Sequence, residues 1–121
     1  MQPMVMQDWI TIAGTANTNI AMSQADWLLT APFQDITFYF ECRSLLSTPS
    51  IQYETSPGRD EQLFFAMGAN TAVATGVAAA KTFYTANANA PVSHWARWKL
   101  VAPNAAWNVT FRIMAAGNSL A

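Results

Sequence analysis

Charged side chains are scarce in this sequence of 121 residues. Asp, Glu, Lys and Arg make up 11 % of the chain, against about 25 % in an average soluble domain. The six basic residues are scattered among seven acidic ones, and the formal net charge is −1. No basic patch is expected to hold a phosphate backbone, so we predict that nucleic acid is not a partner. The low charge favours a small β-sandwich with uncharged polar faces, a surface that neighbouring subunits cover, or both.

The side chains that catalytic and metal sites need are also rare. The chain has one cysteine, Cys42, and one histidine, His94, which excludes an intrachain disulfide and a multi-cysteine zinc site. Asp60 and Glu61 are adjacent in a predicted turn, where their carboxylates would diverge, and the five glycines stand apart. Neither a carboxylate pair for glycoside hydrolysis nor a phosphate-binding loop is predicted. We therefore expect a protein that is not an enzyme and that uses no cofactor and no metal.

Long apolar runs are missing as well. The longest weakly polar stretch, residues 72–80, is too short to cross a bilayer. The first residues lack the basic region and apolar core of a signal peptide. These features predict a protein made in the cytoplasm without a signal peptide, with no membrane as a partner.

The sequence is rich instead in alternation of apolar and polar residues, the period of a strand with one side in a core. One such strand, 107–113, places on one face Trp107, Val109, Phe111 and Ile113. A second strand over 95–101 precedes it, and Pro103 and Asn104 between the two are turn residues. We predict that the rest of the chain packs onto this pair, with Trp98 in the core.

The clearest other strand covers residues 34–45, and its expected core face contains Ile36, Phe38, Phe40 and Cys42. A buried, inert thiol is therefore predicted for Cys42. Residues 50–67 indicate a hairpin, because Pro57 and Gly58 satisfy a type II turn. Glu41 and Glu54 are expected on solvent-facing sides of strands, where they would form cross-strand ion pairs with arginines.

Seven to nine short strands at spacings of roughly 8–15 residues, without a convincing helix, indicate an all-β protein. We predict a single antiparallel β-sandwich, jelly-roll-like, over residues 8–116, with an N-terminal arm at 1–7 and a loose C-terminus at 117–121. Within the arm, Met4, Val5 and Met6 are candidates for docking onto a neighbour, unless this segment is a frayed terminus. A docking arm should be removable with little change in the thermal midpoint.

Two aromatic residues suggest an alternative function. Trp95 and Tyr39 are expected on outward faces of their strands, where they would form a platform for sugar rings. This pattern predicts a carbohydrate-binding module. The competing interpretation is a second, smaller aromatic cluster covered by a loop or by a neighbouring subunit.

Three segments together, residues 51–61, 96–101 and 106–113, resemble small β-sandwich proteins encoded among the structural genes of tailed bacteriophages. Those proteins include capsid decoration and other accessory virion proteins. The resemblance implies a non-enzymatic structural protein that is made in the host cytoplasm and resides in the virion. Its partners would be a capsid or other virion protein and further copies of itself in a homo-oligomer. No functional residue is carried over, because the shared motifs specify strands and a turn.

Overall fold

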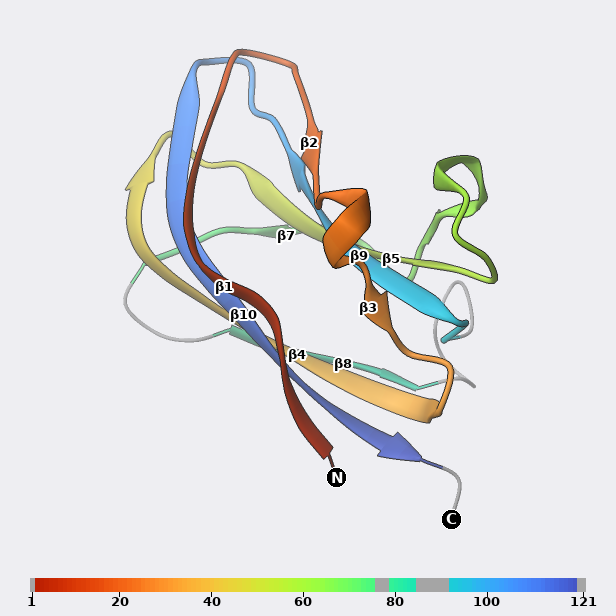
Figure 1. The fold of residues 1–121 in the computed structure, drawn as a ribbon. Coiled ribbons are helices and arrows are strands. Elements are labelled where there is room, and N and C mark those ends of the chain that lie inside the picture. Colours follow the sequence, from red (N-terminus) through yellow and green to blue (C-terminus); the bar gives the residue numbers. More distant parts are fainter. Residues whose placement is uncertain (1, 76–78, 85–91, 120–121) are drawn as a thin grey trace.

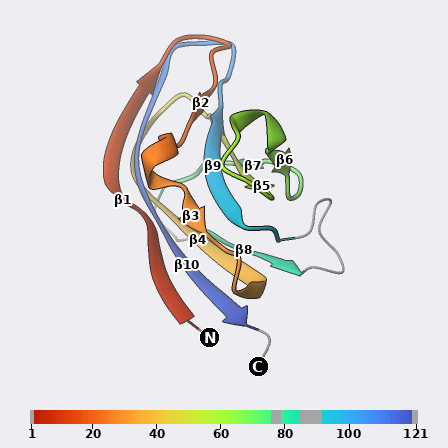
Figure 2. The same ribbon diagram turned by 45° about the vertical axis from the view of Figure 1, so that its right-hand side comes forward.

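Two antiparallel sheets pack face to face in the computed structural model, which describes residues 2–75, 79–84 and 92–119 (Figures 1 and 2). The strands are β1 (Gln2–Gly14), β2 (Ile20–Ala21), β3 (Leu28–Leu29), β4 (Phe33–Leu46), β5 (Ser50–Ser56), β6 (Phe65–Ala66), β7 (Thr71–Ala72), β8 (Ala79–Tyr84), β9 (Trp95–Val101) and β10 (Trp107–Ser119). The first sheet has the order β1-β10-β4-β8. The second has the order β2-β9-β5-β6, with β3 also on β9 and β7 also on β5. The predicted all-β sandwich is confirmed.

The path of the chain is that of a jelly roll. The first sheet contains β1, β4, β8 and β10. The strands between them in the chain, which are β2 and β3, β5 to β7, and β9, belong to the second sheet, so the chain changes sheets at each of these steps. Because β2 and β3 share one position and β6 and β7 share another, each sheet has four strand positions, as in the eight-stranded double sheet. Every pairing among the described strands is antiparallel.

The tryptophan-rich strands β9 and β10 form where predicted, but they are not paired with each other. β9 lies in the second sheet between β5 and the β2–β3 position, whereas β10 lies in the first sheet between β1 and β4. Their apolar faces meet across the core, where the Trp98 and Phe111 rings pack edge to face with centroids 5.2 Å apart. Both strands are rich in inward-facing apolar residues, and this arrangement buries both faces, which a hairpin within one sheet would not do.

The predicted core is confirmed. All of the following side chains are buried: Phe38, Phe40, Cys42, Trp98, Trp107, Val109, Phe111 and Ile113. Burial raises the pKa of the Cys42 thiol, so the reactive thiolate is disfavoured, as expected for an inert cysteine. Tyr53, from β5, stacks on Phe38 with ring centroids 4.2 Å apart.

The N-terminal segment differs from the expected arm. β1 starts at Gln2 and pairs with β10 from Gln2 opposite Gly117 to Gly14 opposite Trp107. Met6 is buried in the common core, so removing residues 1–7 should cost stability instead of leaving the thermal midpoint unchanged. The C-terminus also differs, because β10 continues through residues 117–119. Residues 120–121 lie outside the described residues.

Two local expectations are partly met. The hairpin at residues 50–67 is confirmed, with Thr55 of β5 opposite Phe65 of β6, and its loop contains the 3-10 helix η2 (Glu61–Leu63). The type II turn is wrong, because Gly58 does not adopt a left-handed φ. Instead, the Ser56 hydroxyl donates to the Gly58 carbonyl and accepts from its N–H. A second 3-10 helix, η1 (Gln24–Asp26), follows Ser23.

Replacing Phe111 by Ala tests the register of β10. This side chain is fully buried and packs against Phe40 and Trp98, so we expect its loss to cost about 3–5 kcal/mol of unfolding free energy in urea titrations. Thr110→Ala, one residue away on the outer face, is the matched control and should cost less than about 1 kcal/mol. A cost below about 1 kcal/mol for Phe111→Ala would mean that the register is wrong.

Tyr53 predicts a loss of stability at alkaline pH. Burial raises the pKa of this phenol well above its ordinary value, whereas the unfolded chain releases the proton near pH 10, about the usual tyrosine value. Above that pH the unfolded state binds fewer protons than the folded state, so stability falls as the pH rises. We expect a flatter decline for Tyr53→Phe than for the wild type, measured by urea unfolding between about pH 8 and 11. Equal slopes would contradict a buried, protonated Tyr53.

Candidate functional site

An apolar row crosses the outer face of the first sheet. Val5 lies opposite Met114, Met114 opposite Tyr39, and Tyr39 opposite Ala80, so the row runs over β1, β10, β4 and β8. Cross-strand partners share a face of the sheet, and the core residues Phe38 and Phe40 flank Tyr39 on the other face. Val5 is 57 % exposed and Tyr39 is 38 % exposed. We call these four residues the outer row.

The three candidate docking residues of the N-terminal segment have different surroundings. Met6 is buried and Met4 packs against the core from a half-buried position. Only Val5 of the three is exposed, at the start of the outer row. Gln7, two residues after Val5, turns toward the core. Its side-chain oxygen accepts a hydrogen bond from the Trp98 indole at 3.1 Å. Register shifts between Val5 and Gln7 and between Gln7 and Ile10 allow this.

A second cluster lies on the same outer face, around Trp9 of β1. The Arg43 and Arg112 guanidinium carbons lie 4.2 and 5.1 Å from the centre of the Trp9 ring. Arg112 also forms an ion pair with Glu41, its cross-strand partner, at 3.0 Å. The predicted ion pair of Glu41 is thereby confirmed. The alternation of apolar and polar residues does not single out Trp9, because the register shifts in β1 interrupt that alternation.

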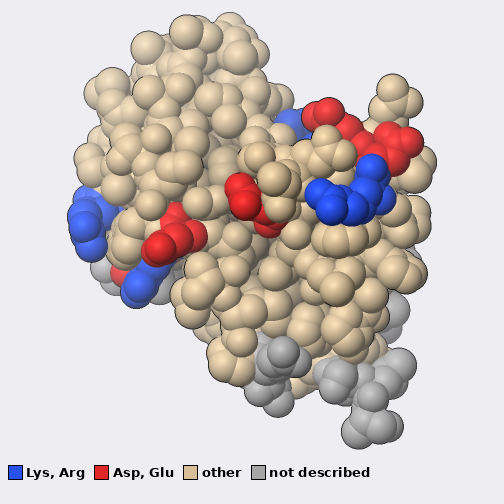
Figure 3. Space-filling model, viewed as in Figure 1, with Lys and Arg blue, Asp and Glu red and all other residues tan. Residues whose placement is uncertain are grey.

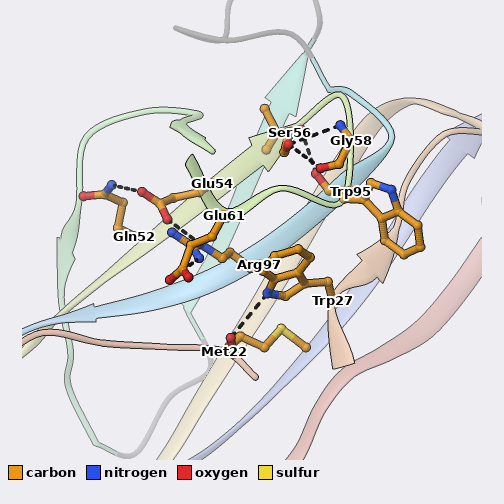
Figure 4. Close-up of polar contacts among 10 residues, drawn as sticks. Met22, Trp27, Gln52, Glu54, Ser56, Gly58, Glu61, Trp95 and Arg97 are labelled. Atoms are coloured by element: carbon orange, nitrogen blue, oxygen red, sulfur yellow. Dashed lines mark hydrogen bonds and ion pairs between the residues drawn. The ribbon is translucent and has the colours of Figure 1, made fainter. Parts of the chain in front are cut away.

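The outer face of the second sheet contains the other predicted ion pair (Figure 4). The Arg97 Nε donates to the Glu54 carboxylate at 2.8 Å, and Glu54 also accepts from the Gln52 amide. Both members of the pair are buried, contrary to the expected solvent-facing position. The pair is buried because two aromatic rings cover it: Trp27, which follows η1, and Phe64, which follows η2. These rings pack edge to face, and the Arg97 guanidinium lies 4.3 Å from the Phe64 ring centre.

Trp95 lies beside this cluster, half-buried, with the Arg59 guanidinium 4.9 Å from its ring centre. Tyr39 belongs to β4 of the first sheet, whereas Trp95 belongs to β9 of the second. Each faces outward, so the two lie on opposite outer faces of the sandwich. The structure does not bring the expected sugar-binding platform together.

The remaining candidates for chemistry are dispersed. His94 is exposed, and in the part of the chain that the structure describes no three or more His, Cys, Asp or Glu residues gather in a group that could hold a metal ion. Asp60 caps η2 by accepting from the Gln62 backbone N–H. No helix within the described ranges is long and apolar enough to span a membrane.

The buried ion pair predicts a marked difference between two arginine substitutions. Arg97→Ala leaves the buried Glu54 carboxylate without its cation, so we expect a loss of about 3–5 kcal/mol of unfolding free energy. Arg112→Ala removes the partner of the half-exposed Glu41 and should cost about 0–1 kcal/mol. Chemical denaturation of both variants measures the difference. Similar, small losses would show that Glu54 and Arg97 are solvated.

The fold and these surfaces define the chain as an antiparallel jelly-roll sandwich with an uncharged outer row and without a catalytic constellation among its described residues. No family model and no curated protein matches the sequence. Solved structures do share the fold. The PBSX exported protein XepA superposes with a TM-score of 0.59 at 11 % identity, covering 98 % of this chain and 37 % of XepA. The chain thus spans little more than a third of the length of that protein.

Two further solved structures come from viral and prophage sources. A protein of infectious bursal disease virus, strain Gx, gives a TM-score of 0.49 at 10 % identity and covers 93 % of this chain and 32 % of the viral chain. The SPBc2 prophage-derived protein YomS gives 0.40 at 12 % identity, with 96 % of each chain covered. Of these structures XepA has a TM-score above 0.5, and at 11 % identity its likeness to this chain concerns the fold alone.

Proposed function

We propose that this chain is a non-enzymatic structural protein that acts by protein–protein assembly, as a phage virion component of the capsid decoration or accessory type. The observation that carries the proposal is the outer row, which gives an open sheet face an apolar centre. Tyr and Met are among the residue types enriched at interfaces. The outer row itself contains no charged residue that would have to leave water, so it is suited to burial against a neighbour.

The distribution of charge supports the same function. Figure 3 shows small, separate patches of acidic and basic residues on a face that is otherwise uncharged. On the outer face of the first sheet, two of the charged residues, Glu41 and Arg112, already neutralise each other. The fold likeness to XepA agrees with this assignment.

The partner that we infer is a capsid or other virion protein, together with further copies of this chain. β1 is an edge strand of the first sheet, and such edges can pair with another chain unless they are short, bulged or charged. The register shifts around Gln7 interrupt this edge. We therefore assign the contact to the outer row and its face of the sheet, with Val5 as the residue of the N-terminal segment that takes part.

Sedimentation of the purified protein over a concentration series tests assembly. We expect self-association of the wild type, and Val5→Lys should weaken it by at least about tenfold, which corresponds to about 1.4 kcal/mol. Leu29→Lys is the matched control: Leu29 is a similar apolar residue, 51 % exposed, in the second sheet, and its substitution should leave association unchanged. A wild type that stays monomeric throughout, or equal effects of the two substitutions, would contradict assembly through the outer row.

A further inference from the structure

A small apolar cavity opens between the two sheets and shares one residue, Ala80, with the outer row. Its volume is about 100 Å³, and its lining includes Phe40, Ile51, Tyr53, Val73, Ala80 and Lys81. Phe40 comes from β4 of the first sheet, and Ile51 and Tyr53 from β5 of the second, so both sheets form its walls. Most of the lining is apolar. The site therefore selects for an apolar occupant.

The polar residues in the wall are Thr71, Lys81 and Tyr53, and Tyr53 is 3 % exposed. Within the described part of the chain its hydroxyl has no hydrogen-bond partner, although the buried indoles of Trp27, Trp98 and Trp107 all donate to an oxygen. Every side-chain nitrogen and oxygen of the described residues that is sealed from open space has a partner. Tyr53 lines the cavity, and we infer that its hydroxyl lies at the cavity surface.

The Tyr53 ring is held in this position. It stacks on Phe38 with an interplanar angle of 8°, and it meets Phe83 edge to face with centroids 5.9 Å apart. These two contacts prevent the ring from turning toward another acceptor. A molecule that brings an acceptor into the cavity can accept a hydrogen bond from this hydroxyl without any rearrangement of the wall.

The cation at the cavity, the Lys81 ammonium, already has hydrogen-bond acceptors within the protein. The Lys81 ammonium donates to the Ala69 carbonyl and to the Thr71 hydroxyl, and thereby ties β8 to the segment that contains β7. Because the ammonium already donates to two oxygens, a ligand does not need a negative charge to bind here. The site requires an apolar body and one acceptor atom.

We propose that this cavity binds a small, uncharged apolar molecule with one acceptor oxygen, such as a five- or six-membered cyclic ether or ketone, and that the Tyr53 hydroxyl donates to that oxygen. An apolar cavity of about 150 Å³ is known to take up benzene. A cavity of about 100 Å³ that is open at one side accommodates a single small ring. This activity is separate from assembly and does not depend on it.

Nuclear magnetic resonance titration with two rings of matched shape tests the site. The probes are tetrahydropyran, which has one ether oxygen, and cyclohexane, which has none. We expect tetrahydropyran to shift the methyl signals of Ile51 and Val73 and to bind at least several-fold more tightly than cyclohexane. Tyr53→Phe should remove this preference, whereas Tyr39→Phe, which deletes the same hydroxyl from the outer row, should leave it unchanged.

A second variant tests the location of binding. Val73→Phe extends the wall into the cavity and should abolish the response to both probes, with its folding checked by the unchanged amide spectrum of β10. Should that variant not fold, Val73→Leu, which adds one methylene group, should weaken both probes. The absence of any shift in the wild type at millimolar tetrahydropyran would overturn the proposal. Equal affinity for the two probes, unaffected by Tyr53→Phe, would overturn it as well.

Discussion

The packing of β10 against β9 across the interior holds the two sheets together, and the rest of the fold depends on it. β10 lies between β1 and β4 in one sheet, and β9 lies between β5 and the β2–β3 position in the other. The edge-to-face contact between Trp98 and Phe111 is therefore near the centre of both layers. Burial of apolar surface supplies the main driving force for such a sandwich. Polar groups that enter the core must then find partners.

The three buried tryptophans show how this requirement is met. Trp98 donates to the Gln7 side chain, Trp107 to the Thr15 carbonyl and Trp27 to the Met22 carbonyl. Each acceptor lies in β1 or in the segments that follow it before η1. The first part of the chain is therefore fixed by the core, and only selected residues such as Val5 remain available to a neighbour. The inward side chains of this segment stabilise the fold, and outward side chains such as Val5 remain exposed. Assembly through the outward side chains is therefore compatible with a stable monomer.

Alternation in the sequence was sufficient to predict the fold class and the core. In residues 34–45 and 107–113 large apolar side chains recur at every second position, and one face of each strand is buried as a result. The same alternation does not indicate which strands pair with each other in a sheet. The strands at 95–101 and 107–113 therefore looked like a pair, although they belong to opposite sheets.

The site features that were missed depend on contacts between distant segments. Glu54 and Arg97 are buried because Trp27 and Phe64, far away in sequence, form a cover over them. Register shifts in β1 turn the Gln7 side chain toward the core, and no local pattern signals such a shift. The cavity beside Tyr53 results from imperfect filling between two sheets, which a single strand's sequence does not encode.

The face of the sandwich that meets a neighbour can be identified from changes in side-chain exposure. Hydroxyl-radical footprinting with mass spectrometry measures the exposure of individual side chains in the free and the assembled protein. We expect labelling of Tyr39 and Met114 to fall on assembly, while labelling of Phe65, which is 63 % exposed in the second sheet, stays the same. Protection of Phe65 with unchanged labelling of Tyr39 and Met114 would contradict this expectation.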